Sequence, residues 1–213
     1  TMIDRYRRNE YSAGLRKWSG MTPEERRARR PLQPAWWAFP TLNSLDRATA
    51  MLPRLLYERM TDLGLDFAVV YPTLALFFPA MKDHEVRGAS YRAYNLMAAD
   101  MFRGLEDRLI PAACIPMETP AEALAELDVA VNQLGLKALM FASLLRRPLA
   151  ATQKEGVPNR QATWLDTLGL ESQYDYDPVW TKCVELKVTP TFHTASQGVG
   201  ARATYSNFVY NHI

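Results

Sequence analysis

The residue of this chain best placed to do chemistry is His193, one of three histidines. It follows the apolar run Val188–Phe192 and precedes the polar stretch Thr194–Gly198, so it stands where a strand would end and a loop begin. In a parallel barrel that position faces the catalytic mouth. A neutral imidazole there can bind a divalent metal, or act as a general acid or base near neutral pH. Position alone does not separate these roles from a histidine whose ring nitrogens are satisfied locally.

Three further residues are candidates for contacting a substrate. Arg146 and Arg147 follow an apolar run and can grip a carboxylate in bidentate fashion, although a solvated loop pair is the simpler alternative. His212 can approach the site from the loop after Phe192, with an ordinary cap or packing role as its alternative. His84 sits among charged residues, and we expect it to be solvated.

No complete catalytic set is recognisable in the chain. A His-x-His pair, which would put two metal ligands on one face of a strand, does not occur, and neither does a Gly-x-Ser-x-Gly elbow. Cys114 and Cys183 lie in apolar segments without CxxC spacing, which argues against a nucleophile, a disulfide framework or a structural zinc site. Unpaired cysteines favour a reducing, cytoplasmic setting.

The elements that must position these residues repeat as a unit, in which an amphipathic helix ends at a Gly or polar turn and a short apolar strand follows. Four strands are predicted in this way, over residues 66–71, 109–115, 136–141 and 188–192. Pro190 weakens the last of them, because proline removes a hydrogen bond from a central strand.

The helices before these strands are predicted from apolar spacing and capping signals. Thr119–Glu122 has the pattern of a capping box with a first-turn proline, and Gly135 is placed to end that helix. Another helix opens at Asp177-Pro178. The side chains expected to face the core are Leu52, Leu55, Leu56, Met60 and Leu63 before Gly64; Ala93, Met97, Met101 and Leu105; Leu124, Leu127, Val131 and Leu134; and Val179, Trp180, Cys183 and Val184.

Helices that alternate with strongly apolar strands indicate an α/β fold with a parallel sheet. No GxGxxG or GxxxxGK[ST] loop follows a strand, so a barrel is favoured over an open nucleotide-binding sheet. We expect residues 1–45 to form an irregular arm with one helix signal at Thr22–Glu25, and residues 46–213 to form a single barrel domain. Residues 144–176 are predicted to be a long loop.

Charge and composition exclude some classes of partner. The formal net charge is +2, too small to indicate a polyanion for the whole protein, so we expect no nucleic-acid partner. The arginine cluster Arg26–Arg30 near Trp36 and Trp37 is explained more simply by a salt-bridged helix or a subunit contact. No run approaches the ~18 apolar residues that span a bilayer, so no membrane association is expected.

Four segments taken together resemble the amidohydrolase-related family, which includes aminocarboxymuconate semialdehyde decarboxylase and the resorcylate decarboxylases. They are Leu65–Thr73, Arg108–Met117, Gly135–Met140, and Tyr176–Trp180 through His193-Thr194. The order and spacing of these segments carry the resemblance, which covers roughly residues 40 to 213.

The resemblance implies a (β/α)8 barrel that holds one divalent metal, commonly zinc or manganese. It places His193 as the metal ligand that ends the fifth strand, so the four predicted strands are the second to the fifth of an apparently incomplete barrel. The other ligands of the family have no counterpart in this chain, and the isolated chain is therefore expected to bind zinc no better than a His193→Ala variant.

The function implied is that of a metal-dependent hydrolase, in which a metal-activated water attacks a small-molecule substrate. Two alternatives stay open: a metal-dependent decarboxylase of an aromatic or unsaturated acid, and a non-catalytic barrel remnant. Assembly into a homo-oligomer stays open as well.

Overall fold

The computed structural model describes residues 20–29, 43–150 and 163–193. The chain divides into two compact units, residues 1–48 with 198–213 and residues 49–197. In the first unit α3 (Pro23–Arg29) begins with the predicted cap, because Thr22 Oγ1 accepts the Glu25 N–H at 3.2 Å and Glu25 Oε2 accepts the Thr22 N–H at 2.9 Å. The helix α4 (Ser44–Thr49) follows.

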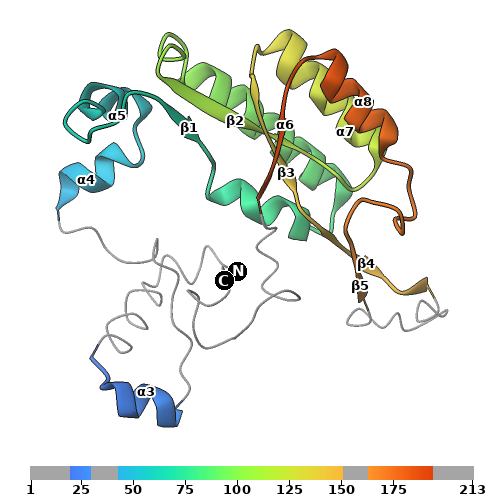
Figure 1. Cartoon of the computed structure of the whole chain (residues 1–213), viewed down its shortest axis with the longest axis horizontal. Helices are drawn as coiled ribbons and strands as arrows, with labels where there is room; N and C mark the ends of the chain where they lie inside the picture. Colours follow the sequence, from blue (N-terminus) through green and yellow to red (C-terminus); the bar gives the residue numbers. More distant parts are fainter. Residues whose placement is uncertain (1–19, 30–42, 151–162, 194–213) are drawn as a thin grey trace. The chain divides into compact units, whose positions relative to one another are not determined.

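The second unit is built on a four-stranded parallel sheet (Figure 1). Its order is β1 (Ala68–Val70), β2 (Leu109–Ile115), β3 (Ala138–Ala142) and β6 (Pro190–His193). The four predicted strands are confirmed, with bounds shifted by a residue or two, and so is the α/β class. Pro190 is accommodated because it is the first residue of its strand.

The register sorts the strand residues onto two faces. Cys114 pairs with Met140, Met140 pairs with Thr191, and Ala142 pairs with His193. Paired residues in parallel strands share a face, and alternate residues of one strand do as well, so Thr191 and His193 lie on one face with Cys114 and Met140. We call this the inner face. By the same register Tyr71, which follows β1, falls on it too.

The outer face of the sheet is covered by α7 (Pro120–Leu127) and α8 (Asp177–Glu185), which lie beside each other in Figure 1. Phe141 of β3 is fully buried there, and its ring lies 6.0 Å from that of Trp180. This layer holds the larger part of the core: Ala113, Ile115, Ala123, Leu127, Leu139, Phe141, Val179 and Cys183 are buried in one cluster.

A single hydrogen bond shows that the sheet is strongly curved. The Tyr71 hydroxyl lies 3.0 Å from Thr191 Oγ1, although β1 and β6 are the first and last strands of the sheet. Neighbouring strands are ~4.8 Å apart, so the edges of a flat four-stranded sheet would be ~14 Å apart, beyond the reach of one tyrosine. The described strands therefore form a curved wall, in agreement with the predicted incomplete (β/α)8 barrel.

The helix α6 (His84–Met101) buries a different face from the one predicted. Met97 and Met101 are 50% and 42% exposed, whereas Tyr91, Asn95 and Ala98 are buried. Asn95 explains the difference: its side chain accepts the Cys114 N–H at 2.8 Å and donates to the Cys114 carbonyl at 2.9 Å. These bonds satisfy β2 where its pairing with β1 has ended at Pro111, so the polar residue faces inward.

The other helices depart from prediction in smaller ways. The helix α5 (Pro53–Arg59) ends before Leu63, which is 47% exposed. α7 begins at the predicted Thr119 cap and continues as a π-helical turn (Asp128–Gln133) to Gly135, whose φ of +71° favours glycine. In α8, Val179 and Cys183 are buried as predicted, but Val184 is 76% exposed.

A two-stranded antiparallel pair corrects the prediction of a loop over residues 144–176. β4 (Leu145–Pro148) pairs with β5 (Thr163–Asp166), and Arg147 lies opposite Trp164 in the register. A 3-10 helix (Leu74–Ala80) follows β1. Within the described part of the chain, no helix combines the length and apolar character needed to cross a bilayer.

Candidate functional site

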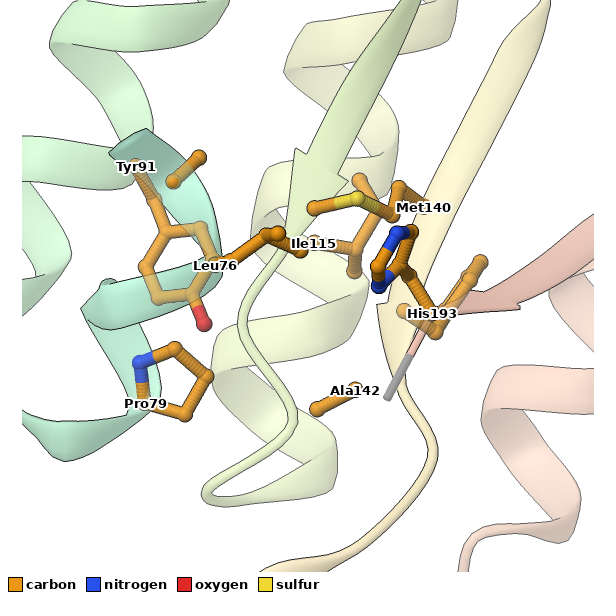
Figure 2. A pocket seen from close by; sticks show the side chains of 9 residues that line it. Leu76, Pro79, Tyr91, Ile115, Met140, Ala142 and His193 are labelled. Carbon is orange, nitrogen blue, oxygen red and sulfur yellow. The ribbon is translucent and has the colours of Figure 1, made fainter. Parts of the chain in front are cut away.

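His193 is the last described residue of β6, at the carboxyl end of the sheet. Its side chain is exposed, and its ring lies 6.3 Å from that of Tyr71 with an angle of 50° between the planes. Figure 2 shows the imidazole turned toward Met140 and Ile115, at the side of a small recess. The predicted placement of His193 at a strand end is thus confirmed, whereas its role as a ligand stays a prediction.

The recess beside His193 has mainly apolar walls. Leu76 and Pro79 of the 3-10 helix and Tyr91 of α6 lie across from the strand ends (Figure 2). Tyr91 is buried, with its ring edge-on to Phe78 at 5.2 Å, and burial raises the pKa of its phenol far above the usual range. The walls on the strand side come from Ile115, Met140, Phe141 and Ala142. None of these lining side chains carries a carboxylate.

Arg147 is held in a buried polar network rather than in a solvated loop. It is 8% exposed, and its Nε donates to the fully buried carboxylate of Asp166. Its Nη1 donates to the Glu118 carbonyl at 3.0 Å, and its Nη2 donates to the Tyr176 hydroxyl at 2.9 Å. The Tyr174 ring lies 4.9 Å from the guanidinium carbon. Every guanidinium nitrogen therefore has a protein partner.

The structure places Arg146 and Arg147 on opposite sides of β4, and contact of either with a substrate carboxylate stays a prediction. Residues 146 and 147 are neighbours on β4, where buried and exposed side chains alternate, so the two guanidinium groups point to opposite sides. Arg146 is exposed, and a substrate contact through it alone stays a prediction. His212 lies outside the described residues, and His84 is exposed at the start of α6, as expected.

Both cysteines are free and buried, as the sequence predicted. Burial raises the pKa of the Cys114 thiol and of the Cys183 thiol. A thiol with a raised pKa is a poor nucleophile near neutral pH. Neither cysteine is therefore a candidate for covalent catalysis.

Glu118 carries a buried carboxylate that the sequence did not reveal. It follows β2 and directly precedes Thr119, the N-cap residue of α7. Both carboxylate oxygens are buried and lack a hydrogen-bond partner among the described residues. Arg87 Nε lies 3.1 Å from Oε1, which makes an ion pair without a well-directed hydrogen bond. Burial raises the pKa of Glu118, and the charge of Arg87 offsets only part of that effect.

A Glu118→Gln variant should therefore change the pH dependence of stability. The pKa of Glu118 is higher in the folded state than in the unfolded state. The wild-type protein therefore loses stability as pH rises through the range between these two pKa values. Glutamine does not ionise, so the variant's stability relative to wild type should be higher near pH 8 than near pH 4.

Urea unfolding at several pH values measures this difference, with the exposed Glu106→Gln as a control. The Glu118→Gln variant also leaves Arg87 without its negatively charged partner. This changes the free energy of unfolding by an amount that is similar at all these pH values. A difference between wild type and Glu118→Gln that does not vary with pH would contradict the assignment.

The described residues do not form a complete metal centre. Among residues 20–29, 43–150 and 163–193, no three His, Cys, Asp or Glu side chains are grouped so that they could hold a metal ion. A hydrolytic metal centre takes three or more protein ligands, so His193 can be only one of them. Its imidazole at the carboxyl end of a strand is nevertheless a ligand type that zinc accepts.

Comparison with known proteins agrees with this architecture. The family model described as "Amidohydrolase" matches residues 46–211. A 2,6-dihydroxybenzoate decarboxylase from Rhizobium superposes with a TM-score of 0.51 at 18% identity, over 81% of this chain and 46% of that one. A 2,6-dihydroxybenzoate decarboxylase complexed with 2,6-dihydroxybenzoate gives a TM-score of 0.50 at 20% identity, over 66% of this chain and 38% of that one.

These likenesses concern the fold. The chain spans less than half the length of either decarboxylase. No curated protein has a significantly similar sequence.

Proposed function

Because the chain belongs to the amidohydrolase family, we propose that it forms part of a divalent-metal-dependent barrel enzyme in which His193 is one metal ligand. The observation that carries this proposal is the position of His193, the terminal residue of a parallel strand, with its ring beside a recess. We propose zinc or manganese as the metal. The remaining ligands would come from outside the described residues.

We further propose that the reaction is the decarboxylation of a small aromatic or unsaturated acid. The recess favours this reaction over the hydrolysis expected first, because its lining is apolar and, within the described residues, includes no carboxylate to serve as a general base for water. Leu76, Pro79 and Ile115 give the recess apolar walls, and an apolar setting disfavours a carboxylate relative to neutral CO2. A bound metal would polarise the substrate as a Lewis acid.

The protein encoded by the complete gene, incubated with 2,6-dihydroxybenzoate, provides the test. We expect release of CO2 and resorcinol, loss of turnover after chelation, and recovery when Mn²⁺ or Zn²⁺ is added back. Turnover that survives complete metal removal would contradict metal dependence. Hydrolysis of ester or amide substrates without decarboxylation of any aromatic acid would instead support the hydrolase. A protein that binds no metal and turns over neither class would be a non-catalytic barrel.

A further inference from the structure

We propose that Tyr71 is a positioning residue for His193. Its hydroxyl donates a hydrogen bond to Thr191, which we call the tie, and its ring contacts the imidazole. This inference rests on the proposed function in one respect: the orientation of the imidazole affects activity only when His193 binds a metal. The tie itself is a property of the described residues, and it joins the two ends of the sheet across the inner face.

The direction of the hydrogen bonds follows from what each atom can do. The Thr191 hydroxyl bonds to the carbonyl oxygen of Leu139, and a carbonyl only accepts. The single hydroxyl hydrogen of Thr191 is therefore committed to Leu139. At 3.0 Å from Tyr71 Oη, Thr191 Oγ1 can only accept, so the tyrosine donates. The chain of donors runs from Tyr71 to Thr191 to the backbone of β3.

The tie acts on His193 in two ways. Thr191 and His193 are alternate residues of β6 and share its inner face, so anchoring Thr191 fixes the strand directly before the imidazole. Among the described strands, β6 pairs only with β3, and the tie gives it a second anchor, beside β1. The Tyr71 ring also contacts the imidazole, with the centroids 6.3 Å apart, and so limits the rotation of the His193 side chain.

A role in core packing does not account for Tyr71. Tyr71 is 39% exposed, and no buried cluster among the described residues includes it. Tyr94 is a useful contrast, because its hydroxyl also reaches a strand, at 3.3 Å from the carbonyl of Ala112, but its ring packs against a buried cluster. Tyr71 and Tyr94 thus offer the same substitution, Tyr→Phe, with and without contact to the imidazole.

The experiment compares Tyr71→Phe, Thr191→Val and Thr191→Ser with Tyr94→Phe in the protein encoded by the complete gene. The first measurement is the NMR signals of the His193 ring in metal-free protein, where this chain contributes only three histidines. We expect Tyr71→Phe and Thr191→Val to shift these signals similarly, the double variant to add nothing, and Thr191→Ser and Tyr94→Phe to leave them near the wild-type positions.

The second measurement is the affinity for Zn²⁺ or Mn²⁺. Groups that orient a metal-binding histidine typically contribute about 10–100-fold in affinity, and Tyr71→Phe should lose an amount in that range while Tyr94→Phe does not. Unchanged His193 signals in Tyr71→Phe would overturn the proposal, whatever the metal affinity. If the wild-type protein binds no metal, the proposed function fails, and the NMR shifts still decide whether Tyr71 positions the imidazole.

Discussion

Replacement of Asp166 with alanine is expected to lower the free energy of unfolding by about 3–5 kcal/mol, because it leaves the buried Arg147 guanidinium without its counter-charge. Asp166 is fully buried, and its carboxylate also accepts the Leu168 N–H and the Ser172 hydroxyl, both at 2.8 Å. Alanine removes all of these acceptors at once. Urea unfolding of the variant measures the loss.

The control for this change is Asp62→Ala, at an exposed position, which should alter stability by less than about 0.5 kcal/mol. The double variant Arg147→Ala/Asp166→Ala should be destabilised by clearly less than the sum of the single variants, because neither charge is then left alone. A loss in Asp166→Ala no larger than that in Asp62→Ala would show that the ion pair does not stabilise the two strands it joins, β4 and β5.

The same pair has a pH signature. Desolvation alone would raise the pKa of Asp166, but the hydrogen bonds from Arg147, Leu168 and Ser172 outweigh it and lower the pKa below its usual value. The stability contributed by a carboxylate with a lowered pKa is present above its unfolded pKa and is lost as pH falls through the folded value. Asp166→Ala should therefore show a weaker loss of stability on acidification than the wild-type protein.

Replacement of His193 with alanine is expected to reduce turnover of an aromatic acid by about 10³-fold or more. A Lewis-acid metal contributes several kcal/mol to transition-state stabilisation, and each 1.36 kcal/mol corresponds to tenfold in rate. The His193 side chain is exposed, so the fold should survive the change, with an effect on stability of about 0.5 kcal/mol or less.

Steady-state kinetics on both histidine variants measures the effect. His84→Ala is the matched control, because His84 is also exposed, at the start of α6, and does not line the recess beside His193. Turnover of His193→Ala within a few fold of His84→Ala would show that His193 is not part of the chemistry.

Much of the sheet could be predicted from the sequence because its strands are short, apolar and buried. Residues 109–115 form one such run, and the structure confirms those bounds. Local capping chemistry was equally reliable, since the Thr119 hydroxyl accepts the Glu122 N–H as expected. Both features depend on residues that are close in sequence, where spacing alone decides the geometry.

The errors arose where distant residues compete with local patterns. The spacing of Met97 and Met101 indicated a buried face, but the amide of Asn95 is the group that completes the hydrogen bonds of β2. The pairing of β4 with β5 depends on Arg147 and Asp166, two charged residues whose mutual burial no local signal reveals. Polar residues that face inward to satisfy a partner are invisible to apolar periodicity.

The candidate site was only partly accessible from sequence. His193 was found because it directly follows a strand that the sequence predicts. Tyr71 could not be linked to His193 in this way, because the face that it shares with Thr191 and His193 follows from the register between strands. Glu118 offered no such signal, because the burial of its carboxylate depends on how α6, α7 and the loop after β2 meet.

Metal content of the protein encoded by the complete gene tests the central claim most directly. Wild type and His84→Ala, purified in parallel and washed of loosely bound ions, should each retain about one equivalent of zinc or manganese per chain. His193→Ala should retain a small fraction of that amount while its circular dichroism stays that of the wild type. Equal metal content in His193→Ala and wild type would contradict the assignment of His193 as a ligand.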